Sequence, residues 1–496
     1  MPDYIYKIKT MMKKVHYMLW LLCIVGLATV SCSDEEDFTS DMSARLSFSA
    51  DTVRFDTVFT TIGSSTQRFK VYNRNDKGIR LNSVGLAQQG KSGFRINVDG
   101  QYGTSVSGVE VLHDDSMFVF VEVTAAPQAS DAPVLIRDTV VFTLESGLRQ
   151  HVILEAYGQD VVIMRAEVVQ GDTELSAARP YLIYDSLVVA PEARLTIPAG
   201  AVLCFHNGAS MRIHGQVECR GAEGKPVVFR GDRTDKLFPY LPYDRLDALW
   251  GGIAVFSESY GNVFDYVDIH GGAYGIFCEG ATTERRKLDL TNSVIHNVSG
   301  NGLYVECGDL FVANTQISNS GTHCVSLFGG KTEFVHCTIA QFYPWNAFYG
   351  AALYFCNVQD DMLYPLEKAH FFNTIITGNS ADDVSGRDAN QGSDASSSDA
   401  VPFDFLFENC VLNTEVDEKY ASCYVDCVLE NEENETFKAS NFRTVDTYNY
   451  IYDFRLSEQS VARGAGNAAF SSGYPFDMLG VPRPDERPDA GCYQWE

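Results

Sequence analysis

The stretch Leu290-Thr291-Asn292-Ser293-Val294-Ile295 recurs 22 residues later as Val312-Ala313-Asn314-Thr315-Gln316-Ile317, and 22 residues after that as Phe334-Val335-His336-Cys337-Thr338-Ile339. Each copy begins with a large apolar residue, ends with Ile and has Asn or His at its third position. Self-similarity at a short fixed period is typical of repeat architectures. The sequence therefore predicts a solenoid in this part of the chain.

The same frame extends in both directions along the chain. It begins again at Phe264, Phe371 and Phe407, and each of these residues is followed five positions later by Ile or Leu. The last residues of successive copies are 26, 22, 22, 37 and 36 positions apart, so a basic unit of 22 residues carries insertions. A second apolar motif, such as Gly302-Leu303-Tyr304, follows after a short turn. Two short strands and one polar bend per unit predict a coil whose strands lie ~4.8 Å from those of the next coil.

Asparagine dominates the third position of the repeat, at Asn292, Asn314, Asn373 and Asn409. Asn can stack from coil to coil and satisfy backbone groups of the bend. This pattern resembles the pectate-lyase-like right-handed parallel β-helix superfamily. The resemblance implies a β-helix over residues 161–496, with a closing segment at 450–496. A leucine-rich repeat is the main alternative, but its L-x-x-L-x-L frame is absent.

The region before the repeats has a different pattern. Residues 45–160 read as strands separated by turns every 8 to 12 residues or so, and Asp99-Gly100 is one such turn. The alternation of Met117-Phe118-Val119-Phe120-Val121 is typical of a half-buried strand. These features predict an immunoglobulin-like β-sandwich, and the whole protein is expected to be all-β.

The N-terminus has the features of a targeting signal. Lysines between positions 7 and 14 precede an apolar run, residues 18–28, that is too short to span a membrane. The run ends in Thr29-Val30-Ser31-Cys32, which resembles a bacterial lipobox. The resemblance implies that residues 1–31 are a signal peptide and that Cys32 is lipidated. An ordinary secretory signal is the alternative.

The residues after Cys32 are acidic. Ser33-Asp34-Glu35-Glu36-Asp37 resembles the export tag of surface lipoproteins in some Gram-negative bacteria, and a solvated linker is the alternative. We expect residues 32–44 to form an extended tether. The resemblance implies a lipid anchor in the outer membrane, with the protein facing the extracellular side.

Charge and cysteine usage limit the possible partners. The formal net charge of -27 disfavours nucleic acid, which needs a basic surface. Eleven cysteines besides Cys23 and Cys32 form no CxxC pair and no zinc spacing, so we assign no disulfides, cofactor or metal site. The Ser- and Asp-rich residues 380–400 lack the spacing of a calcium loop and are expected to form a mobile, solvated insertion.

The second strand of each coil offers a candidate binding face. With Ile276, Leu303 and Leu353 facing inward, three aromatic residues and two glutamates face outward. Sugar rings pack on aromatic faces, and charged side chains bind hydroxyls. The alternative is that the aromatic residues only cover the solenoid or contact the sandwich domain. The predicted ligand-binding residues, including two from adjoining loops, are Phe277, Glu279, Tyr304, Glu306, Tyr354, Trp345 and Arg285.

Catalysis is not assigned to any residue. The outward positions beside the first apolar column collect no carboxylate cluster, and the Asp-Asp and Gly-His-Gly pattern of polygalacturonase relatives is absent. Glu279 and Glu306 on adjacent coils would have a spacing suited to a retaining glycosidase. The favoured hypothesis is a non-catalytic surface lipoprotein that binds a polysaccharide or host glycan or mediates adhesion. A polysaccharide lyase or glycoside hydrolase, and a purely structural envelope protein, are the alternatives.

Overall fold

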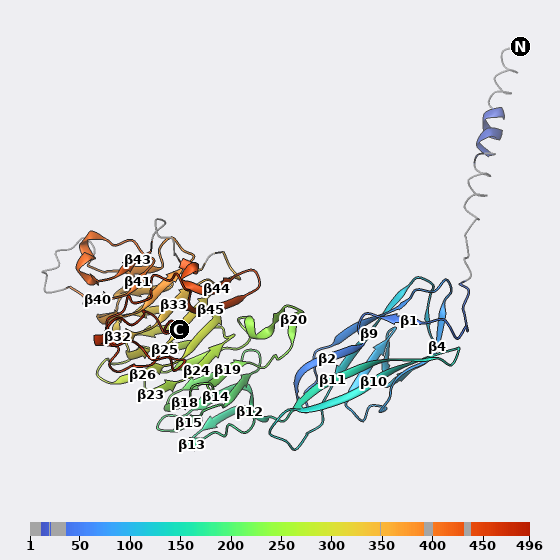
Figure 1. Cartoon of the computed structure of the whole chain (residues 1–496), viewed down its shortest axis with the longest axis horizontal. Coiled ribbons are helices and arrows are strands. Elements are labelled where there is room, and N and C mark those ends of the chain that lie inside the picture. Colours follow the sequence, from blue (N-terminus) through green and yellow to red (C-terminus); the bar gives the residue numbers. More distant parts are fainter. Residues whose placement is uncertain (1–10, 19, 21–35, 348, 391–399, 431–437) are drawn as a thin grey trace, which may run out of the picture. The chain divides into compact units, whose positions relative to one another are not determined.

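The computed structural model describes residues 11–18, 20, 36–347, 349–390, 400–430 and 438–496. The chain forms two compact units built from strands and turns (Figure 1), which confirms the all-β fold class. No helix in the described part of the chain has the length and apolar character needed to cross a membrane. The first unit comprises Met1–Arg54, Ser65–Val123 and Arg137–Glu155, and the second comprises Phe55–Ser64, Thr124–Ile136 and Ala156–Glu496.

Two sheets face each other across the apolar core of a β-sandwich. In β9, Val119 and Val121 are fully buried while Phe118 and Phe120 on the opposite face are exposed, as the alternation in the sequence predicts. Phe142 joins the sheets, with its ring centroid 5.0 Å from that of Phe48. One sheet contains β1 (Leu46–Phe48), β3 (Gln67–Asn73), β9 (Ser116–Val123), β5 (Phe94–Val98) and β6 (Gln101–Gly103). The other contains β2 (Thr52–Phe59), β11 (Arg149–Gln159), β10 (Val134–Leu144), β4 (Ile79–Leu86), β7 (Ser105–Val106) and β8 (Val109–Val111).

The described part of the predicted tether is held on the sandwich. The backbone amide of Gly78 donates to Asp37 O, and Gly78 also forms a β-bridge with Phe38. The Phe38 ring lies 4.0 Å from the Arg80 guanidinium, and the Glu36 carboxylate accepts a hydrogen bond from the backbone of His113. From Glu36 onward the acidic segment is therefore bound, because its backbone and its one aromatic ring find partners on the sandwich.

From Val162 onward the second unit is a parallel β-helix (Figure 1). Its strands form three ladders, so each coil contributes three strands. The prediction of two strands per coil was wrong because the repeated bend divides the first motif into two strands. One face consists of β13 (Thr173–Glu174), β15 (Arg194–Pro198), β18 (Gln216–Arg220), β23 (Asn262–Asp265), β26 (Arg286–Thr291), β29 (Asp309–Ala313), β32 (Gly330–Val335), β37 (Leu366–Phe372), β40 (Phe403–Glu408) and β42 (Tyr424–Val425).

The other two faces belong to one sheet that contains two parallel ladders. Long β12 (Val162–Val169) and β14 (Tyr181–Val189) precede both ladders. The first ladder consists of β16 (Val202–Phe205), β19 (Val227–Gly231), β24 (Val267–His270), β27 (Val294–Val298), β30 (Gln316–Ser320), β33 (Thr338–Gln341), β38 (Ile375–Gly378), β41 (Val411–Leu412) and β43 (Val428–Leu429). The second consists of β17 (Ser210–Ile213), β22 (Gly252–Val255), β25 (Ile276–Cys278), β28 (Leu303–Glu306), β31 (Val325–Phe328), β34 (Leu353–Cys356) and β39 (Val384–Arg387).

The asparagine bends connect the first face to the first ladder. Asn292, Asn314 and Asn373 have φ angles of 50°, 48° and 49°, a left-handed conformation that Asn tolerates better than most residues. The Asn314 amide donates to Asn292 Oδ1 at 3.1 Å. The predicted stacking of Asn side chains at a backbone bend is therefore confirmed.

The interior of the β-helix follows the predicted phase. The residues that open and close each repeat, such as Leu290 and Ile295, are fully buried, and so are Ile276, Leu303 and Leu353 of the second ladder. All eleven described cysteines are free, and most are buried. The hydrophobic stacking of equivalent positions therefore builds the core without disulfides.

The C-terminal segment covers the flank of several coils. Asn314 donates to Phe476 O at 2.9 Å and accepts from Arg483 at 2.8 Å, while Gly491 N donates to Asn373 O at 2.7 Å. The hairpin of β44 (Phe442–Asp446) and β45 (Ile451–Leu456) packs Phe442 and Phe454 against outward residues of the first ladder. The segment predicted to close the helix thus lies along its side. Short 3₁₀ turns η3 (Lys438–Asn441) and η4 (Ala468–Phe470) connect its parts.

Part of the predicted low-complexity insertion is a coil of the β-helix. Strand β39 pairs with β34, and Val384 points inward. Asp383 is fully buried and accepts a hydrogen bond from Asn413 at 2.6 Å. Burial raises the pKa of Asp383 to about 7, with Glu430 and Asp382 adding to the rise while Asn413 and Lys438 oppose it. The expectation of a loop was wrong for Val384–Arg387, which form strand β39, and residues 391–399 lie outside the described part.

Candidate functional site

Most of the predicted binding residues lie together on the outer side of the second ladder. Phe277 stacks on Tyr304 with ring centroids 4.9 Å apart, and Tyr304 lies 4.8 Å from Phe328. Phe328 in turn lies 5.7 Å from Tyr354. The four residues come from adjacent strands β25, β28, β31 and β34 and form a continuous aromatic ladder.

The ladder residues are largely occupied with one another. Because the Tyr304 ring lies between its two neighbours, its faces are not free for a sugar ring. Its hydroxyl donates to Glu306 at 3.0 Å, and burial followed by the charge of Glu306 raises the pKa of Tyr304. Glu306 also accepts a hydrogen bond from Gly280 N at 3.3 Å, and Glu279 accepts one from Ser257 N at 2.9 Å. These contacts favour a role in stability.

Two predicted site residues lie against other partners. The Arg285 guanidinium lies 4.2 Å from the centre of the Tyr260 ring. Trp345 stacks on Tyr450 with centroids 4.2 Å apart, at the turn of the β44–β45 hairpin. Cys32, the predicted lipidation site, lies outside the described residues, so its role stays a prediction.

A pocket with a volume of about 410 Å³ lies on the outer side of the first ladder. Its floor is formed by β24, β27 and β30, with the β44–β45 hairpin on one side and η1 (Tyr243–Arg245) contributing Asp244 and Arg245. A hydrogen bond of 3.2 Å from the Arg245 guanidinium to Asn449 O links these two walls. The remaining lining residues are Asp268, His270, Val294, His296, Asn297, Gln316, Ser318, Asn319, Tyr450, Ile451, Tyr452 and Phe454.

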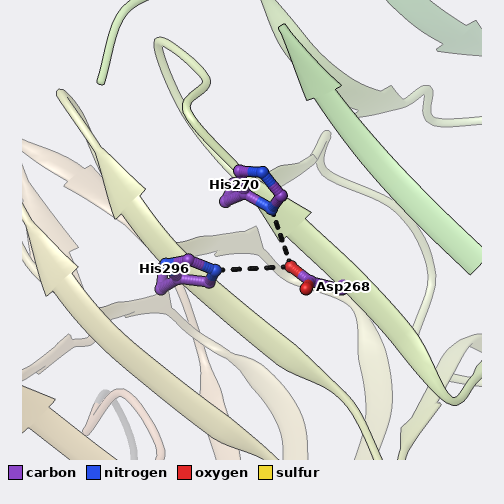
Figure 2. A group of neighbouring side chains, drawn as sticks. All are labelled: Asp268, His270 and His296. Atoms are coloured by element: carbon purple, nitrogen blue, oxygen red, sulfur yellow. Dashed lines mark hydrogen bonds and ion pairs between the residues drawn. The ribbon is translucent and has the colours of Figure 1, made fainter. Parts of the chain in front are cut away.

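Three potential metal ligands meet on the floor of this pocket. Figure 2 shows that His270 and His296 both point towards Asp268. Asp268 Oδ1 lies 2.8 Å from His270 Nδ1 and 3.4 Å from His296 Nε2. The two rings stack with centroids 4.9 Å apart because they occupy paired positions on adjacent strands. The other nitrogen of His270 lies 3.4 Å from Asp244.

The charges of this group reinforce one another. Burial alone would lower the pKa of His270, but Asp268 and Asp244 outweigh it and raise the pKa to about 9. Burial also opposes ionisation of Asp268, yet the two imidazoles hold the pKa of its carboxyl far below the usual value. At neutral pH the group is therefore an ion pair in a partly enclosed pocket, which is an arrangement often found at functional sites.

The repeat contains a signal for this group that the sequence predictions did not use. The residue after the repeated Ile reads His270, His296 and Ser318 in three consecutive coils. Sequence spacings such as CxxC do not reveal this group, because its histidines come from different coils. Reading this column would have placed the two histidines side by side. The C-terminal hairpin that encloses the two histidines lies outside the repeat, so the repeat pattern does not predict where this hairpin packs.

Comparisons with known proteins identify no family for this chain. No family model matches the chain, and no curated protein matches it. One similar solved structure is a family 123 glycoside hydrolase from Clostridium perfringens, with 6% identity, a TM-score of 0.16 and coverage of 23% of this chain and 25% of the hydrolase. Another is PapD-like domain 7 of human CEP192, with 10% identity, a TM-score of 0.17 and coverage of 25% of this chain and 89% of that domain. Neither match indicates a shared fold or activity.

Proposed function

We propose that this protein is an outer-membrane lipoprotein that is anchored through Cys32 and binds an uncharged glycan without cleaving it. The observation that carries the binding proposal is the pocket between the first ladder and the β44–β45 hairpin. Its volume of about 410 Å³ falls in the usual range for small-molecule sites. This pocket replaces the aromatic ladder as our preferred binding site.

The lining of the pocket combines two kinds of contact that sugars need. Tyr450 and Tyr452 supply aromatic surface at one wall, and Tyr450 also stacks on Trp345. Asp244 and His296 supply polar groups with 47% and 26% of their side chains exposed, and these groups can hydrogen-bond to hydroxyls. The net charge of -27 disfavours anionic polysaccharides, so a neutral ligand fits the electrostatics best.

A glycan array with the full-length protein would identify the ligand, and calorimetric titration with the best array ligand would test the site. Tyr450→Ala should weaken binding by 10-fold or so, since a stacking contact is worth about 0.5 to 1.5 kcal/mol and Trp345 also loses its partner. Tyr448→Ala is the matched control, because Tyr448 is 85% exposed in the same hairpin and does not line the pocket.

Two results would count against the proposal. Equal affinity of the Tyr450→Ala variant and the wild type would exclude the pocket as the binding site. Release of new reducing ends or unsaturated products from the bound glycan would show that the protein cleaves it by hydrolysis or elimination, which is the enzymatic alternative.

A further inference from the structure

We propose that Asp268, His270 and His296 bind a divalent transition-metal ion of the zinc class. One ligand atom from each residue, a carboxylate oxygen or an imidazole nitrogen, lies within 4.8 Å of the other two. The two imidazoles point towards the Asp268 carboxylate (Figure 2), and all three residues line the floor of the pocket. This proposal does not depend on glycan binding.

The two distances from the Asp268 carboxylate to the histidines are close to the ligand spacing of a zinc site. Tetrahedral zinc with bonds of ~2.0 to 2.2 Å holds its ligands at ~3.3 Å from one another. The distance from Asp268 Oδ1 to His296 Nε2 is 3.4 Å and that to His270 Nδ1 is 2.8 Å. The two imidazole nitrogens lie within 4.8 Å of each other, so rotation of the side chains would bring them to the zinc spacing.

The scaffold fixes two of the ligands in a rigid register. His270 and His296 are paired residues on parallel strands β24 and β27, so their backbones are locked by the sheet. Asp268 is on the same face of β24, two residues before His270. Sites built on strands hold ligand geometry more closely than sites on loops.

A second layer of residues orients His270. Its Nε2 atom lies 3.4 Å from Asp244, and Asp244 is itself paired with Arg230 at 2.5 Å. Metal-binding histidines commonly donate their other ring N–H to a carboxylate, which fixes the tautomer and the ring orientation. The arrangement leaves His270 Nδ1 directed towards Asp268, and this nitrogen becomes a ligand when the metal ion displaces the Nδ1 proton to solvent.

Three protein ligands leave room for a fourth on the pocket side. The side chains of Asp268 and His296 are 33% and 26% exposed, so an ion can reach them from solvent. Two imidazoles and one carboxylate suit zinc and neighbouring first-row metals, whereas calcium prefers a shell made only of oxygen atoms. An open coordination position in a pocket would accept water or a ligand oxygen.

The test is a titration of the purified, metal-free full-length protein with Zn²⁺ by calorimetry and with Co²⁺ by visible absorption. We expect one high-affinity equivalent of Zn²⁺ and tetrahedral Co²⁺ bands, with no Ca²⁺ binding at this site. His296→Ala should weaken Zn²⁺ binding at least 10-fold and abolish the Co²⁺ bands. Asp244→Asn should weaken binding by about 10- to 100-fold through the orientation of His270.

Matched controls come from other His–carboxylate pairs on the same β-helix. His206 contacts Asp232 at 2.6 Å and His214 contacts Glu258 at 2.7 Å, each with one carboxylate. His206→Ala and His214→Ala should bind Zn²⁺ as the wild type does. Circular dichroism before the titration separates loss of the site from loss of the fold, and His296→Ala is preferred because its side chain is partly exposed.

The proposal would be overturned if the wild type bound no Zn²⁺, or if folded His296→Ala bound it with unchanged affinity and Co²⁺ spectrum. In either case the three residues form only a charged cluster. Because no glycan takes part in this titration, its failure leaves the proposed glycan-binding function untouched.

Discussion

Replacement of Asn314 tests whether the asparagine bends hold the β-helix together. Asn314 is almost fully buried, and its amide bonds Asn292, the Phe476 carbonyl and the Arg483 guanidinium. It therefore links one bend to the previous bend and to the C-terminal segment. We compare Asn314→Gly, which removes these bonds but suits the positive φ, with Asn314→Leu, which also introduces strain.

The expected losses follow from the contacts. Loss of the acceptor for the buried Arg483 guanidinium costs about 1.5 to 3 kcal/mol, and loss of the bond to the Phe476 carbonyl about 1 kcal/mol. Asn314→Gly should therefore lower the free energy of unfolding by about 2 to 4 kcal/mol. Asn314→Leu should lose about 1 to 2 kcal/mol more because of its left-handed backbone.

Urea unfolding followed by tryptophan fluorescence is a suitable assay. Trp250, Trp345 and Trp495 belong to the second unit and Trp20 to the predicted signal peptide, so the signal reports the β-helix and not the sandwich. Ser326→Ala is the control. Ser326 faces outward as predicted but is buried, and it makes one hydrogen bond, to Asn301 at 2.8 Å. Its loss should cost about 1 kcal/mol.

The reasoning would be refuted if Asn314→Gly unfolded at the same urea concentration as the wild type. The bend side chains would then contribute no net stability. Equal losses in Asn314→Gly and Asn314→Leu would show that hydrogen bonding matters and that strain at the bend does not.

Three further predictions concern other parts of the chain. The folded-state pKa of Asp383 is raised to about 7, against an ordinary value near 4, so the folded state binds this proton more tightly than the unfolded state does. Stability that is present at low pH is therefore lost as the pH rises from about 4 to 7, and the loss is about 4 kcal/mol. Asp383→Asn should remove most of this loss, and urea midpoints at pH 5 and pH 8 that differ as much as in the wild type would contradict it. Cys32→Ala should abolish incorporation of labelled fatty acid and membrane association, and retention of both would disprove the anchor. Tyr304→Ala should lower stability by about 2 to 4 kcal/mol and leave glycan affinity unchanged, because its ring packs against neighbouring rings; weakened binding in a stable variant would restore the ladder as the binding face.

The repeat made much of the β-helix predictable from the sequence. A 22-residue period with buried positions such as Leu290 and Ile295 fixes which side chains point inward, because equivalent residues of adjacent coils must stack. The same phase placed Phe277, Tyr304 and Tyr354 on one outer face. The number of strands per coil was missed because the sequence does not show that the Asn292 bend has a positive φ and separates two strands.

Other features depend on contacts between residues far apart in the chain. The sequence predicted an outward aromatic face, but it could not show that the rings stack on each other. The stacking follows from the spacing of adjacent coils. The pocket forms because the hairpin that carries Tyr450 approaches Asp268 and His296 from more than 150 residues away in the sequence. The sequence alone determined the repeat, its interior and the candidate outer residues. The tertiary structure decided the site, because loop and hairpin packing depends on shape and long-range hydrogen bonds that have no period in the sequence.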